Sequence, residues 1–530
     1  MKRLIAIILL CCTLALALAA CGKKKDDPKK TNPSDSKTEE TDEYGYAVLG
    51  TSIERFQELD FGGDTIYVLV RNDEKVKREW ETDDLPDAEI DAAVDSRNII
   101  VESDLNLNVE FIYQASDQHA DWERDFTASI SQDVDSKLHE IDIVANFGFN
   151  GMRSTLRNYY ANLLDEDLFP HFQFEFDGDA TCWNRDILEN GTVNGQLYTI
   201  VGDMNLSLIN TAMIIWQNRT LYDKVKRSDD PENIQDLVLS QQWTYDKLFK
   251  WASWYENEGG DGECSNNYGV QIQGEQYPEQ PGEAIPYAWD LELMKKEADG
   301  RFSYNFIGNT KAETALRELR DLYNSEGNAF LAFTANSNTT KKACTCVGGH
   351  FVTGNVIFKG DVLYWNQQSN LYIREMEDTY CLLPWPKYDQ SQADYCTTSQ
   401  GYFNVLSVLD HSKSSVKTKG EAVSAYLQYG TEFSYTHVRN YYFEKVIKSK
   451  WFGTDDSYGD VSKSIAIFME IIDNLSFNYA TIYSQACGKV MERVWKDSYV
   501  DGSTLQAKYN ANQKVYDDGL AELERWFGLS

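Results

Sequence analysis

Positive charge is scarce in this sequence of 530 residues, which has 50 Lys and Arg against 84 Asp and Glu and a formal net charge of −34. Nucleic-acid backbones bind clustered Lys and Arg, so this balance excludes general nucleic-acid binding. No apolar run of about 18 residues, the length of a membrane-spanning helix, follows the first twenty residues. Hydrophobic residues at 42% and charged residues at 25% lie near globular averages, which excludes wholesale disorder.

Recognisable catalytic motifs are also missing. The sequence contains no G-x-S-x-G nucleophile elbow, no H-E-x-x-H zinc motif, no P-loop and no G-x-G-x-x-G after a strand. Its six histidines are not spaced as metal ligands on one face of a helix. We therefore expect a protein that is not an enzyme and that holds neither a cofactor nor a metal. Glycoside hydrolysis by two of the 84 acidic residues remains an alternative, because two such carboxylates need no local motif.

The amino terminus predicts export and lipid anchoring. Lys2 and Arg3 precede an apolar stretch at 4–20, which has the length of a signal peptide. The stretch ends in Leu-Ala-Ala before Cys21, which resembles the lipobox of bacterial lipoproteins and implies cleavage after residue 20 and lipidation of Cys21. An ordinary secretory signal is the alternative. The segment at 21–59 is expected to be a flexible tether, which would hold the protein at the outer face of the cell membrane.

Strand and helix patterns alternate after the tether. Apolar and β-branched residues predict strands at 65–70, 105–111 and 141–145, and apolar residues at helical spacing predict helices at 90–101 and 122–138. This order is typical of a parallel α/β unit with right-handed crossovers. Ligands of such sheets bind beyond the carboxyl ends of the strands. We therefore predict ligand contacts from Arg71 and Asn72 after the first strand and from Asn146 and Phe147 after the third.

The rest of the chain continues this α/β pattern. Apolar runs predict strands near 206–216, 354–358 and 405–409, and helical spacing predicts helices at 243–254 and 312–322. Helices dominate from residue 421 to the end. Aromatic residues make up 13% of the chain, and most of them are expected to pack in the core.

Five short stretches, in order along the chain, resemble the extracellular solute-binding proteins of ABC importers, and most closely the carbohydrate-type family 1 lipoproteins. They are FGGDTIYVLV at 61–70, VNGQLY at 193–198, GDMNLS at 202–207, WTYDKL at 243–248 and LLPWPKYD at 382–389. The chain departs from the family at Cys381 and at 344–346, and only a general helical similarity continues beyond Asp389.

The resemblance implies an α/β fold with two lobes of the class II, Venus-flytrap type, joined by hinge strands. It places the first lobe at 60–206 with 356–402, and the second at 207–355 with 403–530. Asp203 and Asn205 then lie at the first crossing between the lobes, Trp365 near the next crossing and Trp289 on a loop of the second lobe. We expect all four to contact ligand. Packing in the core is the alternative for the two tryptophans, and a turn or hinge cap is the alternative for Asp203.

The family's role implies a binding protein that captures a neutral saccharide or oligosaccharide between its lobes and delivers it to ABC permease subunits in the membrane. Sugars present C–H faces to aromatic rings and hydroxyl groups to Asn, Asp, Glu and Arg, which suits the aromatic content and the candidate residues. The expected protein is extracytoplasmic and monomeric. Two alternatives remain: a surface glycoside hydrolase that degrades polysaccharides, and a protein that presents its ligand to a membrane sensor kinase.

Overall fold

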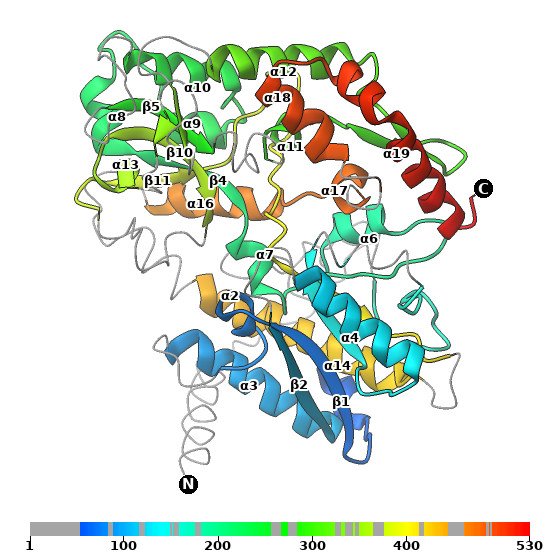
Figure 1. Cartoon of the computed structure of the whole chain (residues 1–530). Helices are drawn as coiled ribbons and strands as arrows, with labels where there is room; N and C mark the ends of the chain where they lie inside the picture. Colours follow the sequence, from blue (N-terminus) through cyan, green and yellow to red (C-terminus); the bar gives the residue numbers. More distant parts are fainter. Residues whose placement is uncertain are drawn as a thin grey trace, which may run out of the picture. The chain divides into compact units, whose positions relative to one another are not determined.

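Two β-sheets organise the described part of the chain (Figure 1). The computed structural model of this protein describes residues 53–82, 88–115, 122–148, 151, 158–174, 182–255, 267–273, 284–323, 330–333, 343–344, 349–363, 376–412, 418–443, 461–483, 487 and 490–529. All of them belong to one unit of the chain, 48–530. Among them, one sheet has four strands, the other has six, and β6 (Met294–Lys296) and β7 (Phe302–Tyr304) form a hairpin. Cys21 and Trp365 lie outside the described residues.

The four-stranded sheet has the order β12-β3-β1-β2. Its strands are β1 (Asp64–Asn72), β2 (Leu107–Ala115), β3 (Ile143–Phe147) and β12 (Asn404–Val408). β1 pairs in parallel with β2 on one side and β3 on the other, and α3 (Ala88–Leu105) and α4 (Trp122–Ser136) connect these strands along the chain. This confirms the predicted strand–helix–strand–helix–strand order. β12 pairs antiparallel with β3 and brings a distant part of the chain into the sheet.

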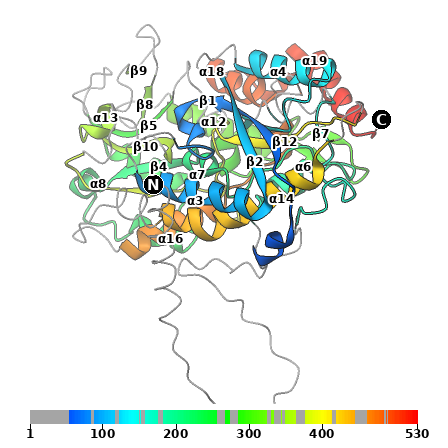
Figure 2. The same cartoon turned by 90° about the horizontal axis from the view of Figure 1, so that it is seen from below.

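Apolar side chains of α4 cover one face of this sheet. Phe126 and Ile130, four residues apart on α4, are fully buried in one cluster with Leu69 of β1 and Val144 of β3. The strands lie between α4 and the pair formed by α3 and α14 (Gly420–Phe433), which contact each other (Figure 2). Ile66, Val68 and Val70, which alternate with Leu69 along β1, are also fully buried, so both faces of this strand are covered.

The six-stranded sheet has the order β11-β4-β10-β5-β8-β9. Its strands are β4 (Met213–Asn218), β5 (Tyr268–Gln273), β8 (Phe330–Phe333), β9 (Ala343–Cys344), β10 (Val356–Val362) and β11 (Tyr380–Leu383). β4 pairs antiparallel with β10 and β11, and β10 pairs in parallel with β5. β4 and β10 are buried along their whole lengths, as central strands with both faces covered must be.

The strand pairing shows which sheet each later strand joins, while the lobe ranges stay a prediction. Residues 356–402 were assigned above to the first lobe, but β10 and β11 belong to the six-stranded sheet. Residues 403–530 were assigned to the second lobe, but β12 belongs to the four-stranded sheet and α14 packs against α3. The reason is that an apolar run predicts a buried strand without indicating its partner, so the order of motifs along the chain could not decide which sheet each strand joins.

The predicted strand at 206–216 is wrong in its first half. Residues Leu206–Asn210 form the short helix α7, and β4 begins only at Met213. The helix starts after a turn in which the Asn205 side-chain Oδ1 accepts a hydrogen bond of 3.2 Å from the Gly202 amide. The backbone amide of Ser207 then donates to the buried carboxylate of Glu79 at 2.8 Å. A continuous apolar run cannot separate a buried helix from a buried strand, and here a polar contact from a distant residue favours the helix.

The predicted helices at 243–254 and 312–322 correspond to α10 (Tyr245–Ala252) and α12 (Thr310–Tyr323). The other helices are η1 (Ile53–Glu58), α2 (Glu74–Lys77), α6 (Arg185–Gly191), α8 (Arg219–Val225), α9 (Ile234–Leu239), η3 (Ser253–Tyr255), α11 (Ile285–Ala288), α13 (Gly349–Val352), η7 (Ser434–Val438), α15 (Arg439–Tyr442), α16 (Val461–Asp473), α17 (Tyr479–Tyr483), η10 (Met491–Lys496), α18 (Asp497–Asp501) and α19 (Leu505–Trp526). Across the described ranges, no helix combines the length and apolar character that crossing a bilayer requires.

Candidate functional site

The candidate site lies at the edge of the four-stranded sheet where β1 and β3 end. Val70 pairs with Ala145, so the next residues, Arg71 and Asn146, lie side by side near the carboxyl ends of two neighbouring strands. β12 runs antiparallel to β3 and its first residue, Asn404, pairs with Phe147. The carboxyl ends of two parallel strands therefore meet the point at which the chain re-enters this sheet. Ligands of open α/β sheets bind at such an edge.

Arg71 is the central charged residue of this edge and is only 1% exposed. Its Nε donates a hydrogen bond of 3.0 Å to Asn404 Oδ1, and its Nη2 donates one of 2.5 Å to the Tyr402 carbonyl oxygen. The guanidinium lies 5.2 Å from the centre of the Phe147 ring, and Phe147 and Tyr402 meet edge to face at 5.4 Å. Burial lowers the pKa of Arg71 to about 10, so the guanidinium stays charged at neutral pH. Its Nη1 has no hydrogen-bond partner among the described residues.

Asn404 and Glu79 hold this arginine in place. The Asn404 carboxamide accepts from Arg71 through Oδ1 and donates through Nδ2 to the Glu79 carboxylate at 2.5 Å. Glu79 is 3% exposed and also accepts from the Ser207 amide, while Arg97 donates to its backbone carbonyl at 2.7 Å. Burial raises the pKa of Glu79, and the hydrogen bonds from Ser207 and Asn404 oppose that rise. One network thus joins β1, the segment after α2, α7 and β12.

A close approach of two backbone segments fixes the position of Phe147. The Gly148 amide donates to the carbonyl oxygens of Gly401 and Phe403 at 3.1 and 2.9 Å. A Cβ atom at Gly148 would lie 2.8 Å from the Phe403 ring, closer than carbon atoms can approach, so this position requires glycine. The end of β3 is therefore tied to the segment that enters β12.

Asp203 and Asn205 lie where the chain first leaves the four-stranded sheet for β4. The Asp203 carboxylate accepts a hydrogen bond of 3.3 Å from Arg439 Nη1 of α15, and its backbone amide donates to the Cys182 carbonyl at 3.0 Å. The Arg439 guanidinium stacks 3.7 Å from the Tyr435 ring centre. Burial raises the pKa of Asp203 to about 6, although Arg439 opposes the rise. Asn205 is 1% exposed and forms the turn before α7.

Comparison with solved structures identifies the fold. The GacH receptor of Streptomyces glaucescens, described unliganded and with acarbose, is 14% identical, with a TM-score of 0.50 over 86% of this chain and 99% of that chain. A cyclo/maltodextrin-binding protein in complex with maltotetraose is 13% identical, with a TM-score of 0.51 over 86% and 97% of the two chains. The sugar-binding protein MalE of Xanthomonas citri is 10% identical, with a TM-score of 0.52 over 88% and 100%.

The chain has the fold of these sugar-binding proteins. No protein-family model matches the sequence, and no curated protein matches it. The two-lobe α/β fold predicted from the ordered stretches at 61–389 is therefore confirmed by structure alone. The described strands form the four-stranded and six-stranded sheets of this fold.

The solute-binding fold gathers some of the predicted site residues and separates others. Arg71, Asn146 and Phe147 lie together at the edge of the four-stranded sheet, and Asn146 Oδ1 accepts from the Phe147 amide at 2.8 Å. Asn72 is the exposed last residue of β1. Trp289 lies directly after α11 and is 1% exposed. No described contact joins Trp289 to the Arg71 network.

Trp289 follows α11 and packs against two tyrosines. Its ring centre lies 4.7 Å from that of Tyr245 and 5.4 Å from that of Tyr388. The same ring lines a small apolar cavity between α10 and α12. Its surroundings are thus those of a core residue, which is the alternative that the sequence left open.

Sequence reasoning missed four members of the Arg71 network, namely Glu79, Ser207, Tyr402 and Asn404. Asn404 had a usable signal, because it directly precedes the apolar run of the predicted strand at 405–409. A polar residue at the start of a buried strand becomes a candidate for the same sheet edge as Arg71 once it is known that the strand runs antiparallel to β3. Glu79 had no such signal, since it lies among other charged residues after α2.

Proposed function

We propose that this protein is the substrate-binding lipoprotein of an ABC importer and that it captures a neutral saccharide or oligosaccharide between its two lobes. The fold supports this proposal, since the similar structures are of sugar-binding proteins, two of them described with an oligosaccharide or acarbose. The protein would act by binding and release, without changing its ligand. Closure would follow from a ligand that contacts both lobes and so stabilises the closed form.

The observation that carries the proposal is the convergence of Arg71, Phe147, Tyr402 and Asn404 at one sheet edge. An aromatic ring offers a face to the C–H groups of a pyranose, and a fixed guanidinium donates to hydroxyl groups. Arg71 Nη1 is buried and lacks an acceptor within the described part of the chain. A buried donor without a partner costs about 1–3 kcal/mol, so a ligand hydroxyl that accepts from Nη1 would bind favourably. Glu79 and Asn404 keep the guanidinium in place before ligand arrives.

Membrane attachment is the second part of the proposal and depends on the sequence. Cleavage before Cys21 and acylation of that cysteine would hold the body at the outer face of the membrane through the segment at 21–59. A nearby permease would then receive ligand over a short distance. Incorporation of labelled palmitate into the wild-type chain, and its loss in Cys21→Ala, is the expected result. Equal labelling of both chains would contradict the lipid anchor without affecting the binding function.

Calorimetric titration of the full chain with a panel of neutral mono- and oligosaccharides tests the binding function. We expect at least one sugar to bind, and Phe147→Ala to weaken that binding at least about tenfold through loss of the stacking face. Phe249→Ala is the matched control, because Phe249 is 37% exposed on α10 and belongs to the other lobe. Failure of every sugar to bind would refute the proposal. Release of shorter sugars from the titrated oligosaccharide would instead favour a glycoside hydrolase.

A further inference from the structure

A polar cavity of about 520 Å³ lies away from the Arg71 network. Its walls come from the end of α6, the segments after α11 and β7, the start of α12 and the residues before α17. Four carboxamides line it, from Asn190, Asn305, Asn309 and Asn478. Ligand cavities for small molecules measure about 300–1,000 Å³, so this volume suits a small organic compound.

Each carboxamide is held at one end by the protein. Asn190 Nδ2 donates to the Phe477 carbonyl at 2.5 Å, and Asn305 Nδ2 donates to the Glu292 carbonyl at 2.9 Å. The other two are held through their oxygens. Asn309 Oδ1 accepts from the Ala312 amide at 3.0 Å and thereby caps α12. These contacts fix which end of each amide is oxygen and which is nitrogen.

Asn478 is held in the same way at the start of α17. Its Oδ1 accepts from the Tyr287 hydroxyl and from the Ala480 amide, each at 2.9 Å. The opposite ends of the four amides have no hydrogen-bond partner among the described residues. They comprise two acceptors, Oδ1 of Asn190 and of Asn305, and two donors, Nδ2 of Asn309 and of Asn478. Hydroxyl groups both donate and accept, so a polyhydroxy compound matches this mixed set.

The charges around the cavity disfavour an anion. Asp290 and Glu292 contribute two carboxylates, and Lys311 contributes one ammonium group, which donates to the Asp290 carbonyl at 3.3 Å. Burial and the neighbouring Asp290 raise the pKa of Glu292. Within the described residues, no three His, Cys, Asp or Glu side chains are placed to hold a metal ion. The charges thus disfavour an anion, and the mixed donors and acceptors of the carboxamides suit a neutral ligand.

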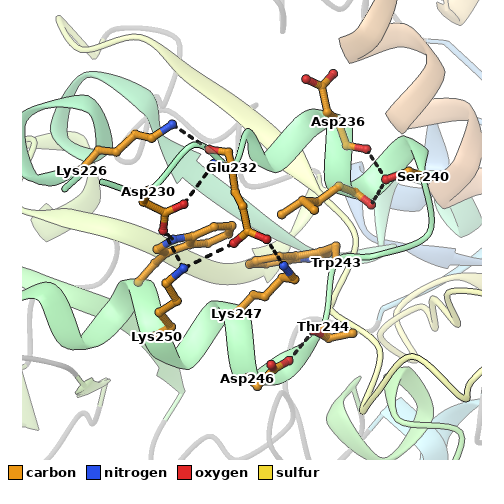
Figure 3. A network of polar contacts seen from close by, with 12 residues as sticks. Lys226, Asp230, Glu232, Asp236, Ser240, Trp243, Thr244, Asp246, Lys247 and Lys250 are labelled. Atoms are coloured by element: carbon orange, nitrogen blue, oxygen red, sulfur yellow. Dashed lines mark hydrogen bonds and ion pairs between the residues drawn. The ribbon is translucent and has the colours of Figure 1, made fainter. Parts of the chain in front are cut away.

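A second cavity, of about 480 Å³, has polar side chains that already have hydrogen-bond or ion-pair partners. Three of the charged side chains that line it are paired: Lys250 Nζ lies 2.6 Å from Asp230 Oδ2, and Glu232 pairs with Lys247 of α10 (Figure 3). Trp251 Nε1 also donates to Asp230 at 3.0 Å. These ion pairs connect the segment before α9 to α10, so the side chains that form them already have partners. The carboxamide cavity differs because one end of every amide remains available.

We propose that the carboxamide cavity is a second binding site, separate from the Arg71 edge, for a small neutral polyhydroxy compound such as a monosaccharide or a sugar alcohol. The two fixed acceptors and two fixed donors would each bind one hydroxyl group. The site goes beyond the proposed transport function, because a ligand there would not contact Arg71 or Phe147.

Equilibrium dialysis of the full chain against radiolabelled D-glucose and D-mannitol tests the site. Asn309→Asp and Asn478→Asp each keep the capping oxygen and replace a free donor by an acceptor. We expect each variant to weaken binding of the bound probe about tenfold. Asn233→Asp is the matched control, because Asn233 caps α9 in the same manner outside the cavity, and it should bind like wild type.

Phe147→Ala separates this inference from the proposed function. Binding that persists in Phe147→Ala and weakens in the two cavity variants supports the second site. Binding that is lost in Phe147→Ala and unchanged in both cavity variants overturns the second site and leaves the transport function intact. Failure of the wild-type chain to bind either probe also overturns the second site, while the oligosaccharide panel tests the transport function independently.

Discussion

The buried carboxylate of Asp203 makes the stability of this protein depend on pH in a calculable way. Its side chain is 16% exposed, and burial raises its pKa from 3.8 to about 6 against the opposing charge of Arg439. The folded-state pKa lies above the unfolded value. At a pH between these two values the Asp203 carboxyl is protonated in the native protein and ionised in the unfolded chain, so the free energy of unfolding falls as pH rises through this window. The full shift is worth about 3 kcal/mol. Between pH 5.0 and 7.5, titration of this one group removes about 1.4 kcal/mol.

Asp203→Asn isolates this contribution. The amide oxygen still accepts from Arg439, but the side chain no longer titrates. The difference in unfolding free energy between the two proteins should therefore move by about 1.4 kcal/mol in favour of the variant from pH 5.0 to 7.5. Urea unfolding followed by tryptophan fluorescence and by far-UV circular dichroism measures this difference, and coincident transitions justify two-state treatment.

A difference that is the same at both pH values, or that moves in favour of the wild type, would refute the reasoning. Asp60→Asn is the control. Asp60 is exposed, and hydrogen bonds from Asn106 and from the Gly62 amide lower its pKa below 3.8. It therefore stays ionised from pH 5.0 to 7.5, and its variant should differ from wild type equally at both ends.

Three further substitutions test the packing and the network. Gly269→Ala should destabilise the protein by more than about 4 kcal/mol or prevent folding, because its Cβ would lie 2.0 Å from the Ala252 carbonyl oxygen, and soluble yield with urea unfolding reports this. Asn404→Leu should cost about 3–5 kcal/mol, because it removes one hydrogen bond from each of two buried charges, Arg71 and Glu79. A double-mutant cycle with Arg71→Met should give a coupling above about 0.5 kcal/mol, whereas additive effects would contradict a shared network. Thr504→Ala, which removes the side-chain cap of α19, should cost about 1 kcal/mol in the same unfolding assay.

Strands β1, β2 and β3 of the four-stranded sheet were predictable because residues close together in the sequence indicate each of them. Apolar runs mark the three strands from 64 to 147, and Phe126, Ile130 and Val134 recur at helical spacing on α4 between β2 and β3. The rule that ligands bind beyond the carboxyl ends of parallel strands then places Arg71, Asn146 and Phe147 at one edge, where the structure has them. No alignment or ligand was needed for that step.

The rest of the site was not predictable because its residues meet only in the folded chain. Asn404 lies 333 residues from Arg71 and Glu79 lies 128 residues from Ser207. Their types are common on surfaces, and nothing in their sequence neighbours distinguishes them. The same limit applies to the later strands. The pairing of β10 with β4 and of β12 with β3 forms only in the folded chain, so the sequence could not indicate which sheet each strand joins.

The strand order itself explains why the candidate site and a chain crossing coincide. β12 runs antiparallel to β3, so it must begin beside the residue at which β3 ends. The segment that returns from the six-stranded sheet therefore reaches the four-stranded sheet at the edge where β1 and β3 end, which is the candidate site, and not at the edge where they begin. Tyr402 and Asn404 lie in that segment and both accept from Arg71. Under the proposed function, a ligand that engages this arginine would bind directly beside the segment that connects the two sheets, so that capture and movement of the two lobes would depend on the same few contacts.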